Sequence, residues 1–349
     1  MTRTHHRTQH RTQQRTRHRT VRRLAAGTAA LVATGALLSG CALGTAGGYV
    51  PTGKLTGDLT DFDGALDGAE ITVGSKNFNE NVILGKMAII LLRSAGAEVT
   101  DLTNIPGSAA ARQAQTDGQI DAMWEYTGTG WITYLGEAEP IPDEQEQYEA
   151  VRDADLEQNQ LVWLPPAPMN NTYAFAMNPE VTERLGIESM SQIADLPVEE
   201  RTFCVESEFT NRPDGLPGML ETYGIPLDQP DGTPESNLRT YQTGAIYDAT
   251  ARGECNFGEV FTTDGRILAL DLTVLEDDQE YFPKYNVSLV LREETAEEHP
   301  EIEELMAPVT EELTDEVLLE LNARVDVDGE EPAEVAYQWL EEQGFVEGE

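Results

Sequence analysis

Short apolar segments alternate with helical stretches along the middle of the chain. An apolar run at 71–74 is followed by a helical pattern at 79–93, which begins with asparagine, a favourable N-cap, and stops before a glycine. A second run at 99–102, a helix at 108–116 and a third run at 120–124 continue the series. This order of strands and helices predicts a parallel sheet with crossover helices.

The same alternation returns further along the chain. A strand is expected at 202–205, helices at 216–223 and 243–252, and another strand at 255–260. Two such α/β units indicate two lobes around a cleft. Ligands in open α/β sheets bind at the carboxyl ends of the strands, so we expect the binding residues in the loops that follow these strands.

The N-terminal 40 residues have the pattern of an export signal. A basic stretch at 1–23 precedes an apolar run of 15 residues at 24–38, too short to span a membrane but suited to a signal peptide. The run ends in LSGC, which resembles a bacterial lipobox and implies cleavage before Cys41 and a lipid on its sulfur. A signal peptide with a chance cysteine beside its cleavage site remains an alternative, and export by the Sec or the Tat route stays open.

Residues 41–69 are rich in Gly, Thr and Asp and show little periodicity. This composition is typical of a flexible tether, here between the lipid and a folded body that starts near Ile71.

The charge of the chain excludes several classes of function. The 349 residues hold 23 Lys and Arg against 63 Asp and Glu, and all the basic excess lies in the first 40 residues, with eight Arg and no acid. Such a surface repels nucleic acid, which is bound through clustered Lys and Arg. After residue 40 the only histidine is His299, which argues against a Ser-His-Asp triad and a multi-histidine zinc site. We therefore expect no nucleic-acid partner, no metal and no cofactor.

Two cysteines remain in the folded part of the chain. Cys204 and Cys255 each lie in a short strand-like run, with a helical stretch between them. An exported protein can keep disulfides, so we predict that the two lie on neighbouring strands and are bonded. A pair of buried free thiols is the alternative.

The expected loops carry six short motifs. In chain order they are GSKNFNE at 74–80, WEYTGTG at 124–130, NNTYA at 170–174, EFTNRPDG at 208–215, FTTDGR at 261–266 and YFPKY at 281–285. Together they resemble the substrate-binding protein of glycine betaine/choline ABC transporters, the OpuAC or ProX-like family. The resemblance runs from Ile71 to about Phe345, and its strength lies in the order of the motifs rather than in any one of them.

The resemblance implies a type II periplasmic-binding-protein fold, an α/β fold with two lobes joined by two crossover segments. On this sequence the lobes map to 70–174 for the first, 175–283 for the second and 284–349 for the return to the first. The resemblance also implies a ligand site with an aromatic cage for a quaternary ammonium group and an anion side for a carboxylate. The cage maps to Tyr126, Tyr173, Phe261 and Tyr285, and the anion side to Lys76, Thr129 and Arg212.

Elementary chemistry supports these residue types. A quaternary ammonium group has no N–H to donate, so ring faces are its main contacts. A carboxylate needs positive charge, and Lys76 is one of only four Lys after Cys41, placed between a strand and a helix start. The guanidinium group of Arg212 could add a bidentate contact to the same carboxylate. Phe261 departs from the usual tyrosine of the family, which leaves the preferred solute open.

The function that this predicts is a lipid-anchored, extracytoplasmic receptor, monomeric and not an enzyme. It would capture glycine betaine or a related osmolyte such as choline, carnitine or proline betaine, and deliver it to an ABC permease with a cytoplasmic ATPase. Its only membrane contact besides the permease would be the lipid. Two alternatives stay open: an extracytoplasmic hydrolase using paired carboxylates, and a sensor or adhesive lipoprotein of the same fold.

Overall fold

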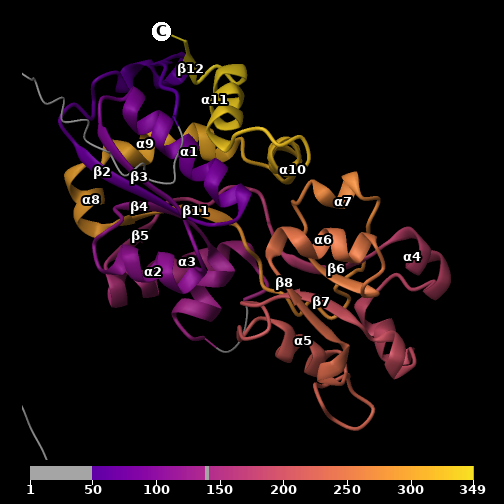
Figure 1. Ribbon diagram of the computed structural model, residues 1–349. Coiled ribbons are helices and arrows are strands. Elements are labelled where there is room, and N and C mark those ends of the chain that lie inside the picture. Colours follow the sequence, from indigo (N-terminus) through magenta and orange to yellow (C-terminus); the bar gives the residue numbers. More distant parts are fainter. Residues whose placement is uncertain (1–48, 138–140, 349) are drawn as a thin grey trace, which may run out of the picture. The chain divides into compact units, whose positions relative to one another are not determined.

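The computed structural model describes residues 49–137 and 141–348 (Figure 1). The predicted signal peptide at 1–40 and the lipidation site Cys41 lie outside the described residues. Within the described part of the chain, no helix combines the length and apolar character that crossing a membrane requires.

One five-stranded sheet is built from the first expected strands and two later ones. In sheet order its strands are β3 (Glu98–Ile105), β2 (Glu70–Lys76), β4 (Ala122–Tyr126), β11 (Val287–Arg292) and β5 (Leu161–Trp163). β2 pairs in parallel with β3 and β4, as predicted, whereas β11 runs antiparallel to β4 and β5. We call the part of the chain around this sheet the first lobe.

Helices cover the first sheet. They are α1 (Asn79–Ser94), α2 (Ser108–Thr116), α3 (Glu144–Asn159), α8 (Glu293–Glu298), α9 (Glu301–Glu311), α10 (Asp315–Asp326) and α11 (Pro332–Glu342). α1 is buried on nearly all sides because it packs between β2 and β3 and the C-terminal helices α10 and α11. Its apolar residues on every face are typical of a helix enclosed in a core.

A second five-stranded sheet forms the second lobe. In order its strands are β10 (Thr273–Val274), β6 (Tyr173–Met177), β9 (Phe257–Phe261), β7 (Phe203–Glu206) and β8 (Leu238–Tyr241). Its helices are α4 (Pro179–Leu185), α5 (Leu216–Thr222), α6 (Thr243–Ala251) and α7 (Arg266–Ala269). β9, β7 and β8 are parallel, while β6 is antiparallel to both of its neighbours.

Short elements complete the chain. They are the strands β1 (Lys54–Leu55) and β12 (Val346–Glu347) and the helical turns η1 (Gly57–Phe62), η2 (Thr129–Tyr134), η3 (Met190–Asp195), η4 (Val198–Glu200) and η5 (Glu235–Asn237).

The chain passes between the two sheets twice, at 164–172 and at 275–286. The predicted fold of two α/β lobes joined by two crossovers is therefore present. The predicted boundary after residue 174 is displaced, however, because Tyr173 already pairs with Phe261 in the second sheet. The second predicted boundary, after 283, falls inside the return crossover.

The predicted tether is the main correction to the fold. From Val50 to Ala69 the chain is folded: Leu55, Leu59 and Leu66 are at most 1% exposed. β1 pairs antiparallel with β12 at the far end of the chain. The apolar residues of this segment are too widely spaced to give a local period, and they pack against distant parts of the chain, namely α1, α9 and β12, so the sequence pattern alone did not indicate burial.

The two cysteines meet as expected, with one difference. Cys204 lies on β7, and a disulfide joins it to Cys255 across a Cα–Cα distance of 5.8 Å. β9 begins only at Phe257, so Cys255 precedes the strand instead of lying on it. β7 and β9 are adjacent in the sheet. The disulfide therefore links the two ends of the segment that contains α5, β8 and α6.

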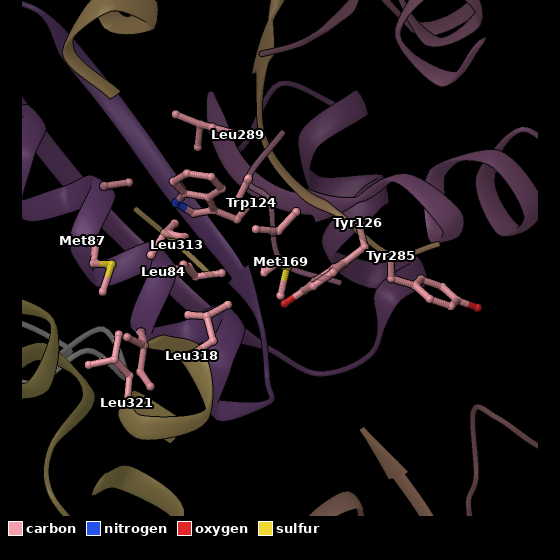
Figure 2. Close-up of a cluster of buried hydrophobic side chains, with 14 of the residues drawn as sticks. Leu84, Met87, Trp124, Tyr126, Met169, Tyr285, Leu289, Leu313, Leu318 and Leu321 are labelled. Carbon is pink, nitrogen blue, oxygen red and sulfur yellow. The ribbon is translucent and has the colours of Figure 1, made fainter. Parts of the chain in front are cut away.

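The core of the first lobe extends to the carboxyl end of β4. Trp124 is fully buried among apolar side chains such as Leu84 and Leu318 (Figure 2). Tyr126 follows two residues later and therefore points to the same face of the sheet. Figure 2 shows Tyr126 and Tyr285 at the edge of this cluster. The strand that fixes the core thus also fixes the position of Tyr126.

Candidate functional site

A cavity of about 510 Å³ lies between the loops of the two lobes. First-lobe loops contribute the segment before α1, the start of α2 and the end of β4. The second lobe contributes the start of β6, the ends of β7 and β9 and the start of α6. The cavity therefore opens at the carboxyl ends of the parallel strands, where binding residues were expected. All seven predicted ligand contacts line it: Lys76, Tyr126, Thr129, Tyr173, Arg212, Phe261 and Tyr285.

Five aromatic rings form a continuous series along the cavity. From Tyr126 to Phe78, Phe261, Tyr173 and Tyr285, successive ring centroids are 5.8, 5.7, 5.1 and 5.5 Å apart. Both lobes contribute rings, and the contact of Tyr173 with Phe261 follows from their pairing between β6 and β9. Phe78 was not among the predicted residues, although it lies in the GSKNFNE motif, where its place directly before a helix could have suggested a ligand contact.

Lys76 ends β2 and is held on two sides. Its ammonium group lies 2.5 Å from a carboxylate oxygen of Glu125. The same nitrogen is 4.6 Å from the ring centroid of Tyr126 and 5.6 Å from that of Phe78. Lys76 is only 4% exposed. Its charge is thus neutralised by a buried carboxylate and stabilised by two ring faces.

Arg212 has a similar partner. Its guanidinium group donates two hydrogen bonds to Asp214, at 2.8 and 2.6 Å, in the bidentate geometry typical of such pairs. It also donates to the hydroxyl of Thr129 at 3.4 Å and lies 5.5 Å from the ring centroid of Tyr173. Asp214 in turn accepts a hydrogen bond from the hydroxyl of Tyr285 at 2.8 Å. Arg212 therefore links three of the predicted site residues.

A buried carboxyl group fixes the position of Tyr126. Glu80, in the first turn of α1, accepts a hydrogen bond from the Tyr126 hydroxyl at 2.7 Å. It accepts three more, from Asn171 at 2.8 Å, Thr263 at 2.6 Å and Asn322 at 2.9 Å. Burial raises the pKa of Glu80 above its usual value, and these four bonds only partly offset that rise. Glu80 thereby joins both lobes and the first crossover behind the cage.

Three glutamates, which we call the glutamate cluster, line the second-lobe side of the cavity: Glu206, Glu208 and Glu259. Glu259 is on β9, two residues before Phe261, so both side chains point to the same face of the sheet. Its carboxylate accepts the backbone N–H of Glu206 at 2.7 Å. None of the three was among the predicted site residues, because single glutamates carry little signal in so acidic a chain; only Glu208 lies in one of the six motifs, EFTNRPDG.

Burial raises the pKa of Glu259 to about 8, and the neighbouring charge of Glu206 acts in the same direction while Arg212 opposes it. Burial also raises the pKa of Glu206. A cation bound in the cavity would favour the ionised form of both groups.

The chemistry of the cavity is that of a site for a cation. Rings and carboxylates face the same space. Such a lining suits an organic cation that has few hydrogen-bond donors.

Comparison with known proteins agrees with this picture. Residues 69–342 match the family described as the substrate-binding domain of ABC-type glycine betaine transport systems. A glycine-betaine-binding protein of Pseudomonas aeruginosa is 38% identical over 292 residues, which cover 81% of this chain and 91% of that protein. The chain belongs to this family.

Other relatives support the same assignment. The glycine betaine-binding protein YehZ of Escherichia coli is 31% identical over 79% of this chain and 91% of its own length. Its solved apo structure has a TM-score of 0.59 at 29% identity, over 79% of this chain and 99% of that one. A solved glycine betaine/carnitine/choline ABC transporter structure has a TM-score of 0.64 at 26% identity, over 78% and 98%.

Membership confirms the predicted family, fold and class of function. Proteins of this family are the extracytoplasmic substrate-binding parts of ABC transport systems, which bind a small molecule and deliver it to a permease. The roles of the seven individual residues in ligand binding stay predictions, as do the lipid on Cys41 and the monomeric state.

Proposed function

We propose that this protein captures a quaternary-ammonium osmolyte in the 510 Å³ cavity and hands it to an ABC permease driven by a cytoplasmic ATPase. The observation that carries the proposal is the series of five rings from both lobes. A trimethylammonium group cannot donate a hydrogen bond, and each ring face contributes about 0.5–2 kcal/mol depending on how well water is excluded.

The rings also suggest how binding is reported to the permease. Tyr126 and Phe78 belong to the first lobe, whereas Tyr173 and Phe261 belong to the second. A ligand held between them favours the arrangement in which the lobes are closed, and that arrangement is the one that we expect to dock on the permease.

The anion side of the proposal rests on Lys76, Thr129 and Arg212. All three line the cavity, but Lys76 and Arg212 already have buried carboxylate partners. We therefore propose that they shape and polarise this side of the site, and that the hydroxyl of Thr129 is a direct contact for an oxygen of the ligand.

The lipid anchor completes the proposal. The LSGC tetrapeptide supports lipidation of Cys41, and a lipid would keep the receptor beside its permease. Replacing Cys41 by Ser should release the protein from the membrane fraction of the producing cells. A Cys41→Ser protein that remains lipidated and membrane-bound would refute the lipobox.

The direct test of the proposed function is calorimetric titration of a soluble form that starts at residue 42, since the segment from Val50 is folded. Glycine betaine, choline, carnitine, ectoine and proline are titrated in parallel. Saturable binding of at least one quaternary-ammonium compound without turnover is the expected result. Binding of proline or ectoine alone, or of none of the five, would contradict the proposal, and product formation would revive the hydrolase alternative.

A further inference from the structure

Glu208 bridges the two lobes at the cavity. One of its carboxylate oxygens accepts the backbone N–H of Ser108 at 3.2 Å, and the other accepts a hydrogen bond from Arg212 at 3.3 Å. Ser108 is the first residue of α2 in the first lobe, whereas Glu208 follows β7 in the second. The contact joins segments 100 residues apart, so it depends on the tertiary structure alone.

These two partners are what a ligand carboxylate would need. A helix N-terminus presents backbone N–H groups and the positive end of the helix dipole to an anion. A guanidinium group adds opposite charge and further donors. Glu208 therefore holds, inside the cavity, the place that suits the carboxylate of a zwitterionic ligand.

The surrounding charges act in the same direction. The two positive side chains of the lining, Lys76 and Arg212, are each paired with a buried carboxylate, Glu125 and Asp214. The three members of the glutamate cluster come in addition. Two positive charges thus face five carboxylates, a formal excess of three negative charges that falls to two when Glu259 holds its proton.

Glu208 is present as an anion at neutral pH. Burial by itself would raise its pKa, but the bonds from Ser108 and the positive charges of Arg212 and Lys76 outweigh burial and hold the pKa below its usual value. Its carboxylate therefore competes as a charged group with that of a ligand.

We infer that Glu208 is a charge-selecting residue: by occupying the anion position, it makes the cavity favour a quaternary-ammonium ligand whose other end is uncharged over one that ends in a carboxylate. Choline represents the first class and glycine betaine the second. The inference rests on the proposed function and extends it to the charge of the ligand's second end.

The experiment compares the affinities of choline and glycine betaine for the wild type and for Glu208→Gln, by calorimetry at one pH and one ionic strength. The wild type is expected to bind choline more tightly. In Glu208→Gln the ratio of the two affinities is expected to shift by about tenfold towards glycine betaine, equivalent to about 1.4 kcal/mol. Glu208→Ala leaves no polar side-chain group at this position, whereas the glutamine variant keeps an amide there. It should shift the ratio in the same direction.

Glu206→Gln is the matched control. It removes one negative charge from the same cavity, but its carboxylate accepts the backbone N–H groups of Glu208 and Phe209 in its own loop and not that of α2. The ratio is expected to shift by less than about threefold. Thermal unfolding of each variant checks that the fold is intact.

The possible failures are distinct. An unchanged ratio in both Glu208 variants, or an equal shift in Glu206→Gln, overturns the inference and leaves the proposed function standing. Binding of neither choline nor glycine betaine by the wild type overturns the inference, and it overturns the proposed function as well when carnitine also fails to bind.

Discussion

The two sides of the cavity manage charge in different ways. On the first-lobe side, Lys76 is paired with Glu125, and Tyr126 is held by a carboxyl group that accepts four hydrogen bonds. On the second-lobe side, Glu206 and Glu259 accept hydrogen bonds from backbone N–H groups, and neither has a Lys or Arg within 4.0 Å in the described residues. The first side therefore sets the geometry of the rings, whereas the second sets the charge of the space between them.

This difference shows that the shape of a binding site and its charge can be set by different groups of residues. A change on the first-lobe side should act on folding and ring position, because its two carboxyl groups, Glu125 and Glu80, are paired with buried protein groups. A change on the second-lobe side should act on pH dependence and ligand charge, because its carboxylates face the cavity with few partners.

The largest effect is expected for Glu80→Ala. The substitution leaves the buried donors of Tyr126, Asn171 and Asn322 without their acceptor, and each unsatisfied group costs about 1–3 kcal/mol. We expect a loss of about 3 kcal/mol or more in the free energy of unfolding, measured by urea denaturation, together with weaker ligand binding. Glu80→Gln keeps an acceptor and should lose less. Equal stability of Glu80→Ala and wild type would show that this side is not the structural one.

Glu259→Gln should change the pH dependence of stability. The pKa of Glu259 is about 8 in the folded protein against 4.5 as its ordinary value, so the folded state keeps a proton that the unfolded chain has released. Its contribution to stability is therefore complete below pH 4.5 and is lost as the pH rises towards 8.

Between pH 5.5 and pH 7 this loss amounts to about 1–2 kcal/mol, and Glu259→Gln should remove it. Thermal unfolding across this range measures the dependence of stability on pH for the variant, the wild type and Glu276→Gln, which changes an exposed glutamate at the start of the second crossover. If stability falls equally with pH in all three proteins, Glu259 titrates as an ordinary surface acid.

Tyr173→Ala should weaken the binding of a quaternary-ammonium ligand at least about tenfold, since the ring lies between Phe261 and Tyr285 and its loss breaks the series. Tyr173→Phe is the control, because it keeps the ring face and should bind within about threefold of the wild type. Calorimetric titration gives both values. Unchanged affinity in Tyr173→Ala would remove this residue from the cage.

Phe261→Tyr should have the smallest effect. The substitution adds a hydroxyl while keeping the ring face, so choline affinity should change by less than about threefold. Any larger change should appear for a ligand with an oxygen-bearing second end, as measured by titration with glycine betaine and carnitine. A large loss for all ligands would indicate that the space beside Phe261 cannot accept an added oxygen.

Much of the site could be predicted because its residues lie in short motifs directly after strands. Lys76 ends β2, Tyr126 ends β4 and Phe261 ends β9, and the ends of parallel strands meet at one edge of a sheet. The order of the motifs supplied the rest of the assignment. The strands β6 and β11 were not predicted, because an alternation of strands and helices indicates parallel strands, and these two run antiparallel to their neighbours.

The polar partners of the site could not be predicted in this way. Glu125 neutralises Lys76 and Asp214 neutralises Arg212, but in a chain with 63 acids no single carboxylate stands out. The segment from Val50 to Ala69 was misassigned for a related reason: its burial depends on elements far away in the chain, α1, α9 and β12.

The sequence by itself determined the alternation of strands and helices, the family and the residue types around the ligand, because these depend on local periodicity and on motifs of a few residues. Only the tertiary structure decided which charges are neutralised, which glutamates face the cavity and that Glu208 reaches the start of α2. Electrostatic interactions depend on distance in space and on burial, and neither quantity can be read from spacing along the chain.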